Sequence, residues 1–153
     1  LQRDGLARIQ LPFGDTHLAE LPEGPLVLIA AGTGMAQMHS LIEHCRAAGF
    51  KYPVHLYWGA RTAADFYELP HWQEWQTLAN LRVQRVVSED PHWPGRRGLL
   101  HAAVREDFAD LKPLHVYASG SPGMVYATLD ALVEAGMDAQ QMRADVFAYA
   151  PRD

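Results

Sequence analysis

A glycine turn, Gly32-Thr33-Gly34, separates two apolar patterns of different period. The continuous apolar run from Leu26 to Ala31 fits a strand buried on both faces, and the apolar spacing from Met35 to Cys45 fits an amphipathic helix. Strand, glycine turn and helix form the first half of a nucleotide-binding βαβ unit. Glycines let the backbone approach a phosphate, and the helix start presents N–H groups and a positive dipole end. A plain strand-to-helix turn fits the same residues equally well.

Three further loops are rich in Gly, Ser, Pro or Arg, and each follows an expected strand. In parallel sheets ligands lie outside the carboxyl ends of the strands, so all four loops are expected around one crevice. Guanidinium groups pair well with phosphate oxygens, which makes Arg61, Arg96 and Arg97 candidate ligands for a phosphate. The three loops span residues 59–61, 88–98 and 119–124.

The rest of the chain supplies the elements that would hold these loops. Helical spacing alternates with apolar or alternating runs, which predicts a parallel sheet with right-handed crossovers. We expect an α/β fold: a Rossmann-like, five-stranded parallel sheet with helices on both faces. Ser121 and Pro122 are expected to cap and begin one helix. Strands are expected at 26–31, 54–58, 81–87, 114–118 and 144–147, and helices at 34–48, near 70–78, at 99–108 and from 122 to 136.

Composition excludes several classes of protein. Thirteen Lys and Arg against eighteen Asp and Glu give a formal net charge of −5 without a basic run, so no nucleic-acid partner is expected. No apolar run approaches the roughly 20 residues that cross a bilayer, so no membrane partner is expected. A single cysteine, Cys45, excludes a disulfide framework and favours a reducing cytoplasm. The eight histidines lack the spacing of metal ligands, so no metal is expected.

Four motifs stand together in an order typical of one family. Over residues 25–150 the chain resembles the C-terminal NAD(P)H-binding domain of the ferredoxin–NADP reductase superfamily. It is most similar to bacterial NAD(P)H–flavin reductases, CDP-deoxyglucoseen reductases and reductase components of oxygenases. The resemblance implies that 1–24 are the tail of a preceding FAD- or FMN-binding β-barrel with its linker, and that 25–153 are the NAD(P)H-binding domain. The motifs are Ile29-Ala-Ala-Gly-Thr-Gly-Met-Ala36, Tyr57-Trp-Gly-Ala-Arg61, Gly95-Arg-Arg-Gly98 and Tyr117-Ala-Ser-Gly-Ser-Pro-Gly-Met124.

This resemblance implies an NAD(P)H-dependent flavoprotein reductase in which nicotinamide passes hydride to a flavin held by the neighbouring domain. Electrons would continue to an iron–sulfur domain, a ferredoxin or free flavin, and this chain alone would turn nothing over. Ser119, where most of the superfamily has Cys, and Phe147 would lie beside the atoms that exchange hydride. The implied cofactor-binding residues are Gly32, Thr33, Gly34, Met35, Arg61, Ser88, Arg96, Arg97, Gly120, Ser121, Pro122 and Met124.

The choice between NADH and NADPH is expected to depend on carboxylates. Glu89 and Asp90 follow the strand at 81–87, where relatives in the resembled family read the adenosine ribose. Carboxylates pointing inward would repel the extra phosphate of NADP, which favours NADH over NADPH, whereas Arg61 or Arg85 pointing inward would reverse that preference.

Two alternatives remain at this point. An S-adenosylmethionine methyltransferase also places a glycine-rich turn after its first strand, but it usually has an acidic residue where this chain has Trp58 to Arg61. An electron-transfer or regulatory subunit would keep the fold and lose nucleotide binding, which four intact loop motifs argue against.

Overall fold

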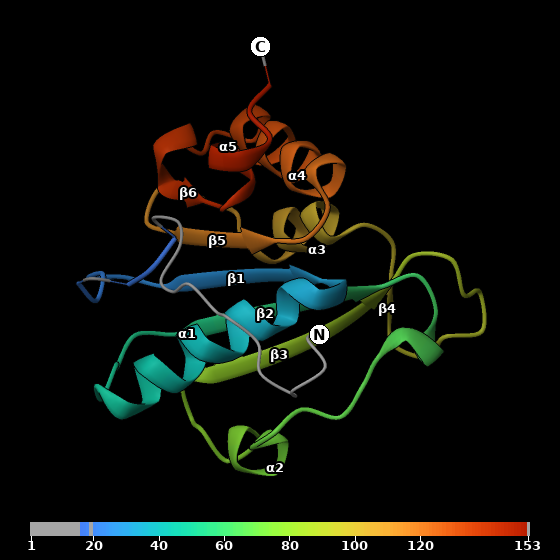
Figure 1. Cartoon of the computed structure of the whole chain (residues 1–153), viewed down its shortest axis with the longest axis horizontal. Coiled ribbons are helices and arrows are strands. Elements are labelled where there is room, and N and C mark those ends of the chain that lie inside the picture. Colours follow the sequence, from blue (N-terminus) through green and yellow to red (C-terminus); the bar gives the residue numbers. More distant parts are fainter. Residues whose placement is uncertain (1–15, 19, 153) are drawn as a thin grey trace, which may run out of the picture.

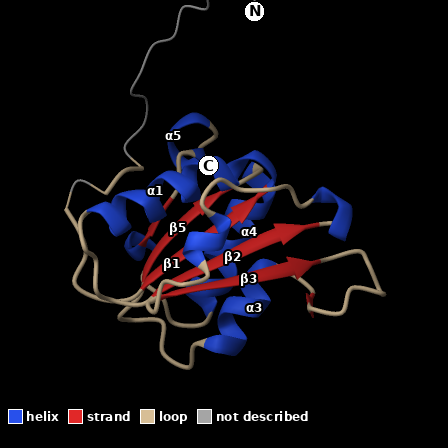
Figure 2. Cartoon of the chain, turned by 90° about the horizontal axis from the view of Figure 1, so that it is seen from below, coloured by secondary structure: helices blue, strands red, loops and turns tan. Residues whose placement is uncertain are grey.

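The computed structural model describes residues 16–18 and 20–152, and in them six strands form one parallel sheet (Figure 1). The strand order is β4-β3-β2-β1-β5-β6, so β1 lies inside the sheet and the later strands add on both sides of it. The arrowheads of the long strands therefore point to one edge (Figure 2). The strands are β1 (Leu26–Ala31), β2 (Val54–Ala60), β3 (Leu81–Val87), β4 (Arg96–Arg97), β5 (His115–Ser119) and β6 (Met142–Arg143).

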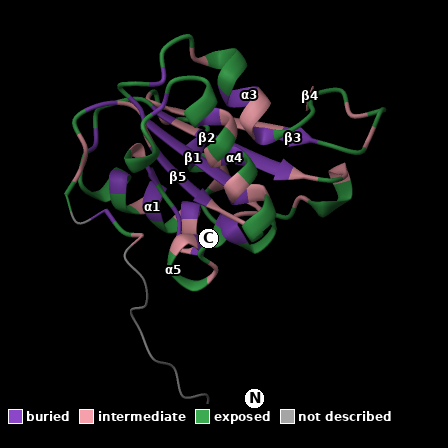
Figure 3. Cartoon of the chain, turned by 90° about the horizontal axis from the view of Figure 1, so that it is seen from above, coloured by how far each residue is buried: buried purple, intermediate pink, exposed green. Residues whose placement is uncertain are grey.

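Helices cover both faces of this sheet because the side chains of β1 alternate between two apolar clusters. Val27 and Ile29 pack with residues of α3 and α4, whereas Leu28 packs with residues of α1. The central strands are consequently buried along most of their length (Figure 3). The helices are α1 (Met35–Ala47), α2 (Trp72–Trp75), α3 (Leu100–Asp107), α4 (Pro122–Glu134) and α5 (Val146–Tyr149), with 3-10 turns η1 (Gly32–Gly34), η2 (Ala63–Asp65) and η3 (Ala139–Gln141).

The α/β fold class is confirmed, and the last predicted strand is wrong. Only Met142 and Arg143 pair with β5, and the chain then turns into α5 instead of continuing as a strand over 144–147. The N–H of Phe147 bonds to the carbonyl of Ala144 at 3.2 Å, as in a helical turn. Four residues, Ala144 to Phe147, are too few to show a period that separates a strand from one helical turn. A second difference is β4, which forms at Arg96–Arg97 inside the stretch predicted as a loop. The described sheet has six strands in place of the five predicted, and β4 and β6 are only two residues long.

The predicted cap and the predicted site of the single cysteine are both confirmed. The Ser121 hydroxyl accepts a hydrogen bond from the N–H of Met124, and Pro122 is the first residue of α4. Cys45 is buried on the apolar side of α1, where burial raises the pKa of its thiol to about 11. Among the described residues, no helix has both the length and the apolar character needed to cross a membrane. The prediction for residues 1–24 falls largely outside the described residues and stays a prediction.

A polar network fastens the β4 edge to α3. The carboxylate of Asp107 accepts hydrogen bonds from Tyr57 Oη at 2.6 Å, Gln84 Nε2 at 2.6 Å and Arg96 Nη1 at 2.7 Å. Removal from water alone would raise the pKa of Asp107, but the three donors outweigh that effect and lower it. Burial and the bond to Asp107 together raise the pKa of Tyr57, so its phenol stays protonated.

Asp107→Asn is expected to lower the free energy of unfolding by about 1 kcal/mol at pH 7, because a charged acceptor is lost at a partly solvated site. Since the pKa of Asp107 is lowered on folding, its contribution is present above the pKa of an unfolded aspartate, about 3.9, and is lost as the pH falls through the folded pKa. Urea denaturation at pH 7 and pH 3 should show the variant and wild type converging at the lower pH. Asp110→Asn, an exposed position that accepts one N–H from Lys112, is the control.

Candidate functional site

Two adjoining hollows open at the edge of the sheet where β1, β2, β3 and β5 end. The glycine-turn hollow has a volume of about 460 Å³ and the arginine hollow about 480 Å³. Both are lined by Ala31 and Gly32, so they form one continuous depression across the carboxyl ends of the strands. The glycine-turn hollow is lined by 31–34 and 119–121. The arginine hollow is lined by Ala31, Gly32, Gly59, Ala60, Arg61, Asp65, Val86, Ser88, Gly98, Leu99, Leu100 and Met124.

The glycine turn needs both of its glycines. Gly32 has a φ of +56°, a left-handed conformation that side chains disfavour. A Cβ at Gly34 would lie 2.2 Å from the carbonyl oxygen of Ser119. Helix α1 has no side-chain cap at Gly34, and η1 has none at Ala31. An uncapped helix start beside a polar hollow is suited to an anion.

The second wall of the glycine-turn hollow is the start of α4. Ser119 is the last residue of β5 and lies opposite Ala30 in the register of the sheet. A Cβ at Gly120 would lie 2.3 Å from the terminal methyl of Met124, so the loop packs closely against its own helix. The hollow is thus lined by two helix starts, small hydroxyl groups and backbone, with room for a flat group.

Arg61 and Asp65 bring opposite charges to the arginine hollow. The carbonyl of Arg61 accepts the N–H of Glu89 at 2.8 Å, which extends the β2–β3 pairing and holds Ser88 beside Arg61. The carboxylate of Asp65 accepts the N–H of Thr62 at 2.8 Å and its hydroxyl at 3.1 Å, and these bonds lower the pKa of Asp65. Asp65 is therefore an anion at neutral pH, and Val86, Leu99, Leu100 and Met124 add apolar surface to the same hollow.

Most of the residues expected at the site lie together. Met35 does not reach the surface: its side chain is fully buried and its N–H already bonds to the carbonyls of the glycine turn. Pro122 begins α4 one residue beyond the lining. The expected residues that line the two hollows are Gly32, Thr33, Gly34, Arg61, Ser88, Ser119, Gly120, Ser121 and Met124.

Three further expected residues, Arg96, Arg97 and Phe147, also lie outside both hollows. The guanidinium of Arg96 is taken up by Glu106 at 2.6 Å and Asp107 at 2.7 Å, so Arg96 fastens β4 to α3. Arg97 donates to the carbonyl of Pro91 at 2.8 Å. Phe147 packs against Tyr126, with ring centroids 5.6 Å apart, and lines a separate hollow of about 370 Å³.

Sequence reasoning missed Asp65 and the Leu99-Leu100 wall. The motif Thr62-x-x-Asp65, a capping box directly after a strand, could have identified Asp65. Gly59 packs against the same wall, since a Cβ at this position would lie 2.6 Å from Leu100. Within residues 16–18 and 20–152, no group of three or more His, Cys, Asp or Glu side chains could hold a metal ion.

The sequence of residues 28–130 matches the family model described as the oxidoreductase NAD-binding domain. The chain belongs to this family. The matched range contains the glycine turn, Arg61, Asp65 and the start of α4, so it includes both hollows.

Three similar proteins are reductases, which is consistent with this family. The chain is 35% identical over 152 residues to the NAD(P)H-flavin reductase of Vibrio harveyi, covering 97% of the chain and 64% of that protein. It is 34% identical over 149 residues to the CDP-6-deoxy-L-threo-D-glycero-4-hexulose-3-dehydrase reductase of Yersinia pestis, covering 96% of the chain and 45% of that protein. The crystal structure of the Amycolatopsis cytochrome P450 reductase GcoB is similar, with a TM-score of 0.78 and 30% identity over 94% of the chain and 46% of that structure. The chain thus spans about half to two thirds of the length of these relatives.

Gly34→Ala is expected to lower the free energy of unfolding by about 2 kcal/mol, because the added methyl meets backbone at Ser119 and one segment must move. Gly123→Ala in α4 is the matched control, since nothing lies within 4 Å of its added Cβ and alanine favours a helix. Urea denaturation of both variants measures the difference. A Gly34→Ala protein as stable as wild type would contradict the contact.

Proposed function

We propose that this domain binds a pyridine dinucleotide across the two hollows and positions its nicotinamide for hydride transfer to a flavin. The observation that carries the proposal is that the two hollows adjoin and share Gly32. One offers an uncapped helix start, and the other offers Arg61 with apolar walls. A dinucleotide needs an anion site between two sites for flat rings, and the order along the sheet edge matches that need.

Each part of the dinucleotide has a suitable neighbour. The pyrophosphate fits the glycine turn, where Arg61 adds a fork of donors from the adjoining loop. The adenosine fits the arginine hollow, against Leu99 and Leu100. The nicotinamide fits the loop from Ser119 to Ser121, where small side chains leave its ring free for a partner. In this arrangement Ser119 is the residue beside the reacting ring.

The flavin belongs to a further domain of the same reductase. The Vibrio harveyi relative is an NAD(P)H-flavin reductase, and more than a third of its length lies outside the matched region. Electrons then pass to free flavin, a ferredoxin or an iron–sulfur domain. Nicotinamide and flavin supply the redox chemistry, and the residues of this chain bind and orient the dinucleotide. The 153 residues alone therefore bind nucleotide without reducing an acceptor, and the buried thiol of Cys45 suits a reducing compartment such as the cytoplasm.

Titration of the chain with NADH should give saturable binding that S-adenosylmethionine does not match. Arg61→Leu is expected to weaken NADH binding by about tenfold, because a hydrogen bond to a charged group contributes about 1.5–3 kcal/mol. Arg105→Leu is the control, since Arg105 is an exposed residue of α3 that lies 3.9 Å from Glu134 and lines neither hollow. Calorimetry or NADH fluorescence gives the affinities. Binding of S-adenosylmethionine in place of NADH would support the methyltransferase alternative, and binding of neither would support a subunit without nucleotide.

We propose that Asp65, and not Glu89 or Asp90, favours NADH over NADPH. Asp65 lines the arginine hollow, which neither Glu89 nor Asp90 does. The carboxylate of Asp90 accepts the N–H of His92 at 2.9 Å instead. A 2′-phosphate on the adenosine ribose would bring like charges together in this hollow.

Asp65→Asn is expected to strengthen NADPH binding by about fivefold at low salt, because the repulsion at an exposed site is modest and screened. Binding of NADH should stay within about twofold. Asp90→Asn makes the same charge change outside the hollow and should alter neither affinity. Equal gains in NADPH affinity from the two variants would mean that the effect comes from net charge and not from Asp65.

A further inference from the structure

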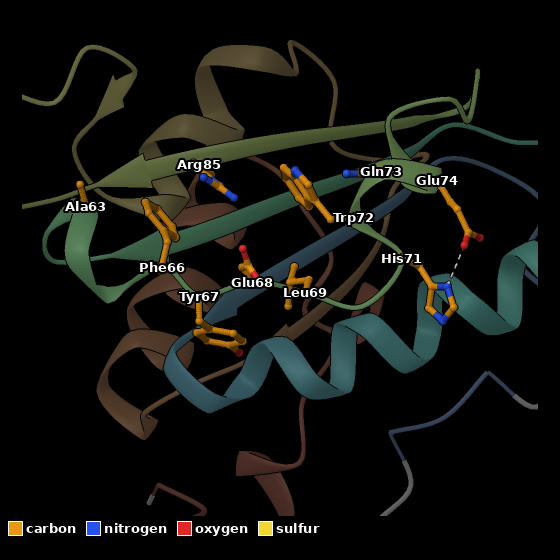
Figure 4. Close-up of a pocket in the computed structure, with 10 residues that line it drawn as sticks. All are labelled: Ala63, Phe66, Tyr67, Glu68, Leu69, His71, Trp72, Gln73, Glu74 and Arg85. Carbon is orange, nitrogen blue, oxygen red and sulfur yellow. Dashed lines mark hydrogen bonds and ion pairs between the residues drawn. The ribbon is translucent and has the colours of Figure 1, made fainter.

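A further hollow, of about 660 Å³, lies beside the segment between β2 and α2 (Figure 4). We call it the aromatic pocket. The nucleotide sites described above do not use it, and its lining contains a cation with no ion-pair partner among the described residues, Arg85. Its lining residues are Ala63, Phe66, Tyr67, Glu68, Leu69, His71, Trp72, Gln73, Glu74 and Arg85.

Arg85 is held by aromatic rings in place of carboxylates. The central carbon of its guanidinium lies 4.7 Å from the ring centroid of Trp72, 5.1 Å from that of Phe66 and 5.2 Å from that of Trp58. Its Nε is buried without a hydrogen-bond partner within the described part of the chain. Cation–π contacts at these distances attach the exposed segment between β2 and α2 to β3, the strand that carries Arg85. Phe66 comes from this segment, Trp72 is the first residue of α2, Arg85 comes from β3 and Trp58 comes from β2.

The same segment reaches the glycine turn through Tyr67. The ring of Tyr67 stands edge-on to the buried Trp58, with centroids 5.1 Å apart and planes at 75°. Its hydroxyl donates to the carbonyl of Gly32 at 3.3 Å. Gly32 is the residue that both nucleotide hollows share and that holds the left-handed conformation. The stack around Arg85 is therefore connected, through Trp58 and Tyr67, to the peptide on which the proposed pyrophosphate site depends.

We propose that Tyr67 is a positioning residue for the dinucleotide: its hydroxyl, presented by the Arg85 aromatic stack, fixes the Gly32 peptide so that the glycine turn faces the pyrophosphate. This inference rests on the proposed function. Binding free energy is gained when the turn is already in its bound conformation, because less ordering remains to be done on association. Residues of the aromatic pocket thus act on nucleotide affinity without lining either nucleotide hollow, and by reciprocity a bound nucleotide orders the segment from Phe66 to Trp72.

The test is nucleotide titration of the whole chain carrying Tyr67→Phe, which keeps the ring on Trp58 and removes only the hydroxyl. NADH and ADP-ribose are expected to bind about threefold more weakly, while adenosine, which lacks the pyrophosphate, binds unchanged. The melting temperature should move by less than about 2 °C, since the residue is exposed. Tyr52→Phe is the matched control, because Tyr52 and Tyr67 are each 44% exposed and Tyr52 lies before β2, at the opposite end of that strand.

Arg85→Met removes the cation from the stack and is expected to weaken NADH binding by a similar factor, whereas Arg82→Met, an exposed arginine of the same strand, is not. Amide hydrogen exchange adds a readout that a purely structural role would leave unmoved. NADH should protect residues 66–72 in wild type and protect them less in Tyr67→Phe. If wild type binds NADH and Tyr67→Phe shows the same affinity and the same protection, this inference alone is wrong. If wild type does not bind NADH, the proposed function itself is wrong.

Discussion

The candidate site depends on one close approach between segments far apart in the sequence. The backbone of Gly34 lies so near the end of β5 that a single methyl group would overlap the carbonyl of Ser119. This contact brings the start of α1 against the loop that leads into α4. Without it the two helix starts would separate, and the glycine-turn hollow would lose one of its walls. Glycine at this position is a packing requirement as well as a conformational one.

A second constraint holds the other side of the site. The loop after β3 returns to the sheet as β4, and its Arg96 is bound by Asp107 and Glu106 of α3. This fastening holds Gly98 and Leu99 beside Arg61. Arg96, which the sequence suggests as a phosphate ligand, thus pairs with α3 and supports the wall of the hollow. Tight backbone packing at Gly34 holds one side of the depression, and a charged hydrogen-bond network at Asp107 holds the other.

Much of this could be predicted from the sequence because local patterns carry it. The apolar run at 26–31, the Ser121-Pro122 helix start and the order of the loops each have a local signature. The structure of residues 144–147 could not be predicted, since four residues are too few to show a period that separates a strand from a helical turn. The partners of Arg96 could not be predicted either, because they depend on which residues another segment, α3, brings alongside.

The order of the strands also bears on how the chain is made. Leu26 of β1 pairs on one side with Val54 and on the other with His115, so the first strand of the sheet is completed by one of the last. Until β5 has left the ribosome, an almost wholly apolar strand has a vacant edge on one side. Such long-range parallel pairing is slow to form, and it leaves unpaired, aggregation-prone strand edges exposed during folding. A chain that stops short of residue 115 therefore leaves one side of this apolar strand without the partner that β5 provides.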